Sequence, residues 1–176
     1  MKPIITPAVL LMLFCNQAFT AEKIGGAFGK ELGQVFEPSS AIGKGELTDG
    51  TPMFQFNPEN TFRSFSKYYV MITPKTHKIY SIWGIGTMQN DPICKKEQEV
   101  IMEILKKKYG QPKKKDLAMN LFDAEMIDHG DRVIVTKCSG FMDTTIDIRY
   151  TDQNLKEIAN KERIEIEGNK LDSSGL

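Results

Sequence analysis

Cysteines are the first residues in this sequence whose type and spacing indicate a definite chemistry. There are three, and Cys15 lies in an N-terminal segment that we expect to be removed. The remaining pair, Cys94 and Cys138, is an even count, which in an exported chain indicates a disulfide more often than a metal site. A redox-active pair would favour a C-x-x-C spacing. We therefore predict a structural bridge that closes a loop of about 45 residues and contributes roughly 4 kcal/mol in the chain-entropy model.

Other patterns that could support catalysis or cofactor binding are weak. His77 and His129 are the only histidines, and His129 with Asp128 and Asp131 is more typical of a polar turn than of a metal site. No serine lies in a G-x-S-x-G motif, and the glycines of segments 26–30 and 43–45 do not match a phosphate loop or a dinucleotide fingerprint. Carboxylate pairs for glycoside hydrolysis stay open, because 23 acidic residues permit many pairs. We assign no catalytic residue, no cofactor site and no metal site.

A cluster of lysines is the one surface feature above background. Eight cations and four acids lie between positions 95 and 116. Cations in the last turn of a helix interact favourably with the helix dipole, which accounts for part of the cluster. The functional alternative is weak contact with an anionic surface, such as lipid, envelope glycolipid or an acidic protein. Six residues would make that contact: Lys106, Lys107, Lys108, Lys113, Lys114 and Lys115.

The elements that must position these residues are mainly strands. Residues 66–73 and 78–88 are rich in β-branched and aromatic residues and flank a short Pro-containing turn, which predicts a hairpin. The second of these runs is apolar on both faces, which places it inside a sheet. Strands are also expected at 124–127, 131–138 and 143–150, the last with clear alternation of apolar and polar residues. Residues 23–50, with seven glycines, read as turns with one helical turn around 30–36.

Two helices are predicted. One spans residues 91–109, between Asp91-Pro92 and Tyr109-Gly110, and the other begins after a cap at Thr151 or Asp152 and closes at Gly168. Their apolar stripes are expected to be buried: Val100, Ile101, Ile104 and Leu105 in the first, and Leu155, Ile158, Ala159 and Ile166 in the second.

This element order predicts an α+β fold with one domain over residues 21–168. A mainly antiparallel sheet would be packed by the central helix, followed by a C-terminal helix and a polar tail at 169–176. Gly84 and Gly86 fall on one face of a strand, where another backbone can approach closely. We expect that approaching backbone to be the packed helix. Four aromatic residues are assigned to the core: Phe54, Phe56, Phe62 and Phe65.

The first 20 residues have the pattern of a secretory signal peptide. Lys2 gives a positive start, residues 4–14 are largely apolar, and Ala18 and Thr20 stand at the −3 and −1 positions of a cleavage site. A membrane anchor is the alternative, but the apolar stretch is about half of the ~20 residues needed to span a bilayer. We predict cleavage and a periplasmic or secreted mature chain with no transmembrane segment.

Composition restricts the class of partner. Removing the leader takes one of 23 basic residues and none of 23 acidic residues, which leaves a net charge of 22 − 23 = −1. A nucleic-acid-binding protein would normally be strongly basic, so we expect no nucleic-acid partner. Hydrophobic residues at 40% and charged residues at 26% are typical of a globular chain.

Several short stretches resemble those of small uncharacterised exported proteins of Gram-negative bacteria. They are the leader, the glycine-rich segment 24–33, Tyr80-Ser81-Ile82, the helix end at Lys108-Tyr109-Gly110, and the closing segment 172–176. The resemblance spans most of the mature chain and implies export and one compact domain. That group carries no activity to transfer, so it implies no residue role.

The leading functional hypothesis is an exported, non-enzymatic interaction domain, with a protein or envelope component as its partner. An envelope hydrolase using dispersed carboxylates and a secreted or surface virulence factor are the alternatives. A deep cleft with two carboxylates about 5–9 Å apart would favour the hydrolase. A shallow surface with an apolar or basic patch would favour binding.

Overall fold

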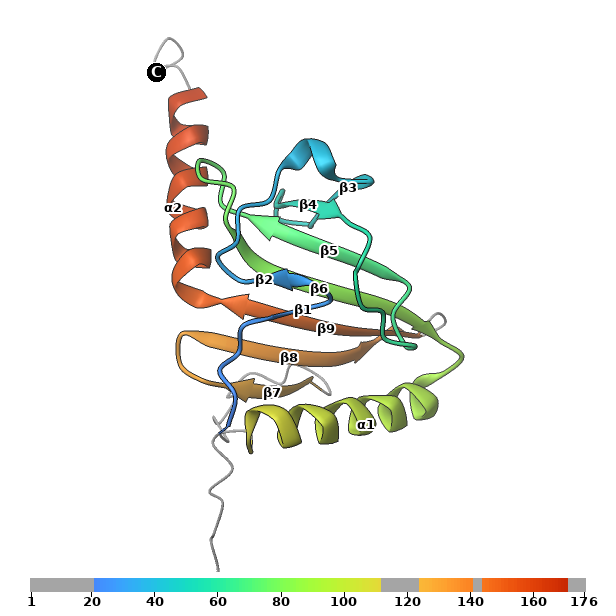
Figure 1. Cartoon of the computed structure of the whole chain (residues 1–176). Coiled ribbons are helices and arrows are strands. Elements are labelled where there is room, and N and C mark those ends of the chain that lie inside the picture. The colour runs from blue at the N-terminus through green and yellow to red at the C-terminus, as the bar shows by residue number, and fades with distance from the viewer. Residues whose placement is uncertain (1–20, 112–123, 141–143, 171–176) are drawn as a thin grey trace, which may run out of the picture.

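A seven-stranded sheet forms the centre of the molecule in the computed structural model, which describes residues 21–111, 124–140 and 144–170 (Figure 1). The strands lie in the order β3-β4-β5-β6-β9-β8-β7, with every pairing antiparallel. Their bounds are β3 (Gly43–Glu46), β4 (Pro52–Gln55), β5 (Lys67–Ile72), β6 (Ile79–Met88), β7 (Ala124–Asp128), β8 (Arg132–Ser139) and β9 (Thr144–Asp152). The other elements are the hairpin strands β1 (Gly26–Ala27) and β2 (Lys30–Glu31), a 3-10 turn (Pro38–Ser40), α1 (Asp91–Tyr109) and α2 (Gln153–Lys170). The predicted α+β class with a single domain is confirmed.

The predicted hairpin is the pair β5–β6, and β6 is the interior strand that its sequence indicated. It pairs with β5 on one side and with β9 on the other. The tight turn between β5 and β6 is closed by reciprocal hydrogen bonds of Thr73, whose N–H donates to the Lys78 carbonyl and whose carbonyl accepts from the His77 N–H. The expected strands at 124–127, 131–138 and 143–150 are also confirmed, as β7, β8 and β9.

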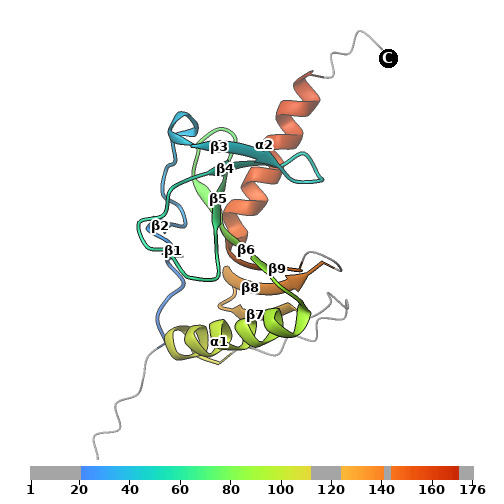
Figure 2. The ribbon, with the colours of Figure 1, turned by 90° about the vertical axis from the view of Figure 1, so that its right-hand side faces the viewer.

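The two faces of the sheet are covered to different extents. The inner face, which carries Ile82, Ile134, Ile146 and Ile148, packs against α1 and against the N-terminal segment 24–36 to form the main core. The outer face packs against α2 in a smaller cluster around Met71, Tyr80 and Ala159. Figure 2 shows β1 and β2 on one side of the sheet and α2 on the other.

Helix α1 covers the inner face at the β7–β9 end of the sheet. Asn90 caps it by accepting a hydrogen bond from the Ile93 N–H, and it ends at Gly110, whose φ of 85° is available to glycine at low cost. Its buried residues are Cys94, Gln98, Ile101, Met102, Leu105 and Tyr109.

The expectation for the stripe of α1 was partly wrong, because Val100 and Ile104 are 39% and 48% exposed. The true buried stripe is centred further around the helix and includes a polar residue. Gln98 is buried because its side-chain amide donates hydrogen bonds to the carbonyl and hydroxyl of Thr136 on β8. A hydrophobic pattern does not identify a polar residue that is buried with its hydrogen bonds satisfied.

Both ends of α1 are fixed to the sheet. The disulfide between Cys94 and Cys138 joins its first turn to the end of β8, as predicted, with the two Cα atoms 6.0 Å apart. At the other end, a His129 ring nitrogen lies 2.8 Å from the carbonyl oxygen of Tyr109, and the two rings meet edge to face. His129 therefore anchors a helix end, and its neighbour Asp128 accepts a hydrogen bond from the Gly130 N–H within the turn.

Gly84 and Gly86 permit a close approach, but the approaching group is not the helix. A Cβ on Gly86 would lie 1.7 Å from the carbonyl oxygen of Ser64, and one on Gly84 would meet the rings of Phe28 and Phe65. The loop 56–66 and the β1–β2 turn fill this part of the inner face with aromatic rings, since α1 does not reach it. Phe54, Phe56 and Phe65 are buried, and Phe62 packs against them, as expected.

The N-terminal segment differs from the sequence-based expectation. Residues 30–36 form no helical turn; Lys30 and Glu31 form β2, and Val35 makes an isolated bridge to Lys78. Phe28 and Gly29, at the tip of the β1–β2 hairpin, have φ of 59° and 81°. The left-handed conformation of Phe28 costs on the order of 1–2 kcal/mol. Edge-to-face contacts with Tyr68 and Phe65, at centroid distances of 4.8 and 5.8 Å, offset this cost.

Helix α2 begins after Asp152, whose carboxylate accepts from the Leu155 N–H and also pairs with Arg132. The cap at this position was one of the two predicted. The helix runs through Gly168 to Lys170, and Ile158 is 43% exposed, so the expected end and part of the expected stripe were wrong. The reason is geometric, because α2 crosses the sheet near β6 and its last turns extend beyond it (Figure 2). No helix in the described part of the chain is long and apolar enough to cross a membrane.

Removing the disulfide should destabilise the fold without changing it. We expect the double variant Cys94→Ser, Cys138→Ser to lose about 2–5 kcal/mol of unfolding free energy, because the bridge holds α1 on β8 and restricts the unfolded chain. Urea denaturation of the mature chain measures this, with reduced wild type as the matched comparison. Alkylation of two cysteines in unreduced, denatured protein purified from its host would contradict the bridge.

The close approach at β6 gives a second prediction. Gly86→Ala should destabilise by about 1–3 kcal/mol or more, because a Cβ cannot coexist with the Ser64 carbonyl without moving the loop. Gly168→Ala is the control, since nothing lies within 4 Å of a Cβ there. Gly168 lies in the last turn of α2, so this change should stabilise by no more than roughly 0.5–1 kcal/mol. Thermal unfolding of both variants separates the two effects, and equal shifts would refute the packing argument.

Candidate functional site

The outer face of the sheet brings together charged and aromatic side chains from three strands. On β9 the alternation that buries Ile146 and Ile148 on the inner face turns Asp147 and Arg149 to the outer one. Pairing then sets two rows across the sheet: Trp83, Arg149 and Val135 in one, and Ile85, Asp147 and Lys137 in the next. Because cross-strand neighbours lie about 4.5–5.5 Å apart at Cβ, these groups act on one another directly.

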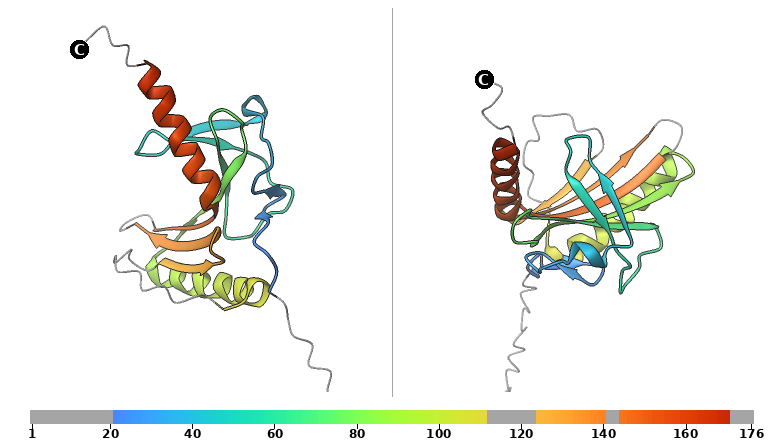
Figure 3. Two further views of the ribbon diagram at one scale, coloured as in Figure 1. Left: turned by 90° about the vertical axis from the view of Figure 1, so that its left-hand side faces the viewer. Right: turned by 90° about the horizontal axis from the view of Figure 1, so that it is seen from above.

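A cavity of about 540 Å³ opens over these rows. Strands β6, β8 and β9 form its floor, and the first turn of α2 supplies Gln153 and Lys156. Seen from above, α2 stands at one end of the strands, which extend away from it (Figure 3). The full lining is Trp83, Val133, Val135, Lys137, Ser139, Asp147, Arg149, Thr151, Gln153 and Lys156. This volume lies within the range of about 300–1,000 Å³ that is usual for small-ligand sites.

Arg149 lies over the ring of the only tryptophan of the chain. Its guanidinium carbon is 4.1 Å from the centroid of the Trp83 ring, and Tyr69 lies on the other side of Trp83 at 6.4 Å. Cation–π contacts of this type contribute about 0.5–2 kcal/mol, more when partly desolvated. Burial lowers the pKa of Arg149, against the attraction of Asp147, but a guanidinium remains charged in proteins.

Asp147 is held in an environment that disfavours its charge. Burial raises its pKa, while Arg149, the Trp83 indole N–H and Lys137 act in the opposite direction. Although the indole N–H is near enough to influence this carboxyl, Trp83 Nε1 is buried without a hydrogen bond of regular geometry. The site therefore contains two partly buried charges, and Arg149 has no hydrogen-bond acceptor among the described residues.

The Asp147 and Arg149 side chains differ from other acidic and basic side chains of the protein that form ion pairs. Arg132 pairs with Asp152 and Arg63 binds Glu97 through two nitrogens. In the described part of the chain, neither Asp147 nor Arg149 makes a close ion pair; Asp147 lies near the Trp83 indole N–H, and Arg149 makes no side-chain hydrogen bond. Most buried polar groups in proteins are satisfied, and Trp83 Nε1, beside the cavity, is an exception among the described residues.

A smaller cavity of about 90 Å³ adjoins this one and shares Arg149, Thr151 and Lys156 with it. Tyr80 and Asp49 lie on its far side. Burial raises the pKa of Tyr80, opposed by Arg163, so its hydroxyl stays protonated near neutral pH. Asp49 differs from Asp147, because hydrogen bonds from Thr51 lower its pKa.

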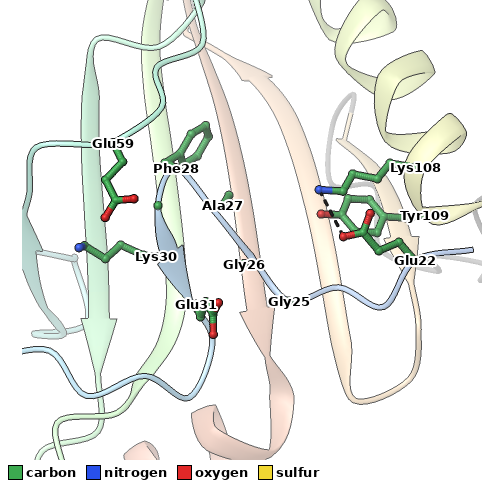
Figure 4. Close-up of a pocket in the computed structure, with 11 residues that line it drawn as sticks. Glu22, Gly25, Gly26, Ala27, Phe28, Lys30, Glu31, Glu59, Lys108 and Tyr109 are labelled. Atoms are coloured by element: carbon green, nitrogen blue, oxygen red, sulfur yellow. Dashed lines mark ion pairs between the residues drawn. The ribbon is translucent and has the colours of Figure 1, made fainter.

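A second pocket, of about 360 Å³, lies on the other side of the molecule between the β1–β2 hairpin and the end of α1 (Figure 4). Its wall is largely the glycine backbone of segment 25–29, and Glu22 pairs with Lys108 across one end at 3.6 Å. Glu59 and Lys30 lie at the opposite end (Figure 4). Glu59 packs where a side chain on Gly29 would be, so the fold accounts for this carboxylate. Segment 26–30 is a hairpin, in line with its poor match to a phosphate loop.

The lysine cluster is only partly within the described residues. Lys106, Lys107 and Lys108 form the last turn of α1, as expected, whereas Lys113, Lys114 and Lys115 lie outside them. Lys106 pairs with Glu103, and Lys108 pairs with Glu22 and lies over the Tyr109 ring. Contact of this cluster with an anionic surface stays a prediction. In the part of the chain that the structure describes, no group of three or more metal-ligating side chains occurs.

Sequence reasoning missed the outer-face site, although one signal for it was present. The alternation in 143–150 correctly placed Asp147 and Arg149 on the side away from the core. Polar residues on that side of a half-buried strand normally face solvent, and nothing local to β9 indicates that Trp83, Val135 and Lys156 arrive from three other elements. Partial burial of a charged row is a property of the assembled sheet.

The raised pKa of Asp147 predicts a pH-dependent effect on stability. Its folded-state pKa lies above the ordinary value of 3.8, so the charged form costs stability at pH 7, and this cost disappears as the pH falls below that value. Asp147→Asn should therefore stabilise the protein at pH 7 but not at pH 3. Asp49→Asn is the control with the opposite sign, because the pKa of Asp49 is lowered. Urea denaturation at the two pH values tests this, and destabilisation by Asp147→Asn at pH 7 would contradict it.

Comparison with known proteins gives no match to a protein-family model, to a curated protein or to a solved structure. The chemistry of the outer face is therefore the basis for a functional assignment.

Proposed function

We propose that this chain is an exported, non-enzymatic binding domain that holds a partner on the outer face of its sheet. The observation that carries the proposal is the Arg149–Trp83 pair, which lies beside a cavity of about 540 Å³ with unused hydrogen-bond donors. Trp83 also packs against the smaller outer-face cluster, but Arg149 belongs to neither cluster of core residues. Maintaining partly buried charge without a structural partner costs stability, which is typical of a functional site.

Export is part of this proposal and has separate support. The leader pattern at residues 1–20 indicates secretion. The bridge between Cys94 and Cys138 is of the kind that persists in the periplasm or outside the cell, because cytosolic thiols are kept reduced. Both features fit a mature chain that acts in an oxidising compartment.

The charge of the cavity supports an acidic partner. Lys137, Arg149 and Lys156 line it together with one carboxylate, Asp147, for a surplus of two positive charges. Binding is favoured over glycoside hydrolysis, because hydrolysis requires a pair of carboxylates flanking the scissile bond. Among the residues that line the large cavity, Asp147 is the single acid.

Site-specific photocrosslinking tests this proposal. A photoreactive benzoylphenylalanine in place of Val135, in the chain exported by its native host, should give a discrete adduct in the periplasmic or secreted fraction. The same group in place of the exposed Lys107 on α1 should not. Arg149→Ala should reduce the Val135 adduct at least several-fold. Equal adducts from the two positions, no adduct at Val135, or a Val135 adduct indifferent to Arg149→Ala would overturn the proposal.

A further inference from the structure

The Arg149 guanidinium has a geometry suited to a planar, two-pronged acceptor. A guanidinium carries five N–H donors in a fixed planar fork. The carbon of the Arg149 guanidinium lies over the Trp83 ring, 4.1 Å from the ring centroid. No described residue takes a hydrogen bond from its N–H donors. A guanidinium that is already held against a ring loses less conformational freedom on binding than a free one, which is how preorganised sites gain affinity.

Asp147 restricts which anion can use this fork. It lies on the same strand and the same face as Arg149, two residues away. A phosphate dianion would bring a second negative charge toward this carboxyl, whereas a carboxylate brings one charge and two coplanar oxygens. Arg–carboxylate pairs are frequently bidentate for that geometric reason. Lys156, which lines both adjoining cavities together with Arg149, adds a cation beside the fork.

The rest of the cavity is suited to a peptide. Val133 and Val135 give an apolar strip on β8, next to the charged row on β9. Ser139, Thr151 and Gln153 supply hydroxyl and amide groups that can pair with peptide N–H and carbonyl groups. Such a surface matches a short segment in which apolar side chains flank an acidic one.

We propose that this cavity binds an acidic peptide segment, whose Asp or Glu carboxylate makes a bidentate contact with Arg149 beside Lys156. Apolar residues that flank the acidic residue would contact Val133 and Val135. This inference rests on the proposed function, since it names the ligand class of the same site.

Titration of tryptophan fluorescence tests the inference directly, because Trp83 is the only tryptophan of the chain and lies in the site. The mature, disulfide-bonded protein is titrated with Ac-Leu-Glu-Leu-NH₂. We expect a saturable change with a Kd on the order of 1 mM, which is reasonable for a peptide of this size. Ac-Leu-Gln-Leu-NH₂ has the same shape without the charge and should bind at least tenfold more weakly.

Three variants separate the fork from general charge. Arg149→Lys keeps the positive charge but removes the planar fork, so it should weaken binding of the Glu peptide at least tenfold. Lys156→Gln should weaken it several-fold. Lys107→Gln, on the exposed side of α1, is the matched control and should bind like wild type. Far-UV circular dichroism and Tm show whether each variant is folded. If the Arg149→Lys variant is unfolded, the binding of the Glu peptide by the Lys156→Gln variant tests the inference instead.

Each contrary result identifies what is wrong. Equal affinity for the Glu and Gln peptides, or full binding by a folded Arg149→Lys variant, would overturn the carboxylate contact. If inorganic phosphate or galacturonate binds more tightly than the Glu peptide, the assignment of a peptide ligand is wrong. If Ac-Leu-Gln-Leu-OH binds more tightly than the Glu peptide, Arg149 contacts a C-terminal carboxylate, and the proposed contact with an acidic side chain is wrong. If no peptide binds although the Val135 crosslink depends on Arg149, this inference fails and the proposed function stands. If both are absent, both fail.

Discussion

The close contact between β6 and the loop that crosses it is the constraint on which the rest of the structure depends. Only glycine at position 86 allows the Ser64 carbonyl to lie where a Cβ would otherwise be, and a Cβ at position 84 would lie 3.2 Å from the Phe28 and Phe65 rings. One helix cannot cover the inner face of seven strands, so rings carried by loops complete the core. On its other face the same strand carries Trp83, the support for Arg149. Strand β6 thus separates the two roles of the sheet, with packing on one side and an open, charged surface on the other.

The energetics of the two faces differ in kind. The inner face gains stability from apolar burial, about 25 cal/mol per Å², and is fixed at its ends by a disulfide and by the His129–Tyr109 contact. The outer face accepts a cost, because desolvation disfavours the charged forms of both Asp147 and Arg149. Their mutual attraction only partly offsets that cost, since they form no close ion pair. A fold selected for stability alone would place apolar or fully solvated residues in this row.

The sequence predicted the architecture better than it predicted the site. Composition around a Pro-containing turn was sufficient for the strands at 66–73 and 78–88, and alternation was sufficient for the strand at 143–150. Asp91-Pro92 and the two alternative caps, Thr151 and Asp152, marked the helix starts, although the cap of α1 is Asn90. The errors share one cause, because burial is decided by tertiary contacts: Gln98 is buried through its bonds to Thr136, while Val100 and Ile104 remain exposed. Similarly, Gly84 and Gly86 predicted a close approach to the strand, but they did not indicate which group approaches. The site on the outer face joins residues 83, 135, 149 and 156, and no local pattern links positions so far apart.

The two groups of cations in this protein should not be equivalent in recognition. Lys107 and its neighbours at the end of α1 are exposed or already paired with acids, and exposed charges are screened over about 8 Å at physiological ionic strength. Their attraction for an anion is therefore weak and carries little geometric information. Arg149 is partly buried, where the effective dielectric constant is lower and a charge 4 Å away interacts by about 4 kcal/mol rather than about 1 kcal/mol. Its orientation is also fixed by Trp83. Selectivity of this chain for an acidic partner should thus reside in the outer face, and a lysine contribution at α1 should be limited to long-range attraction that salt removes.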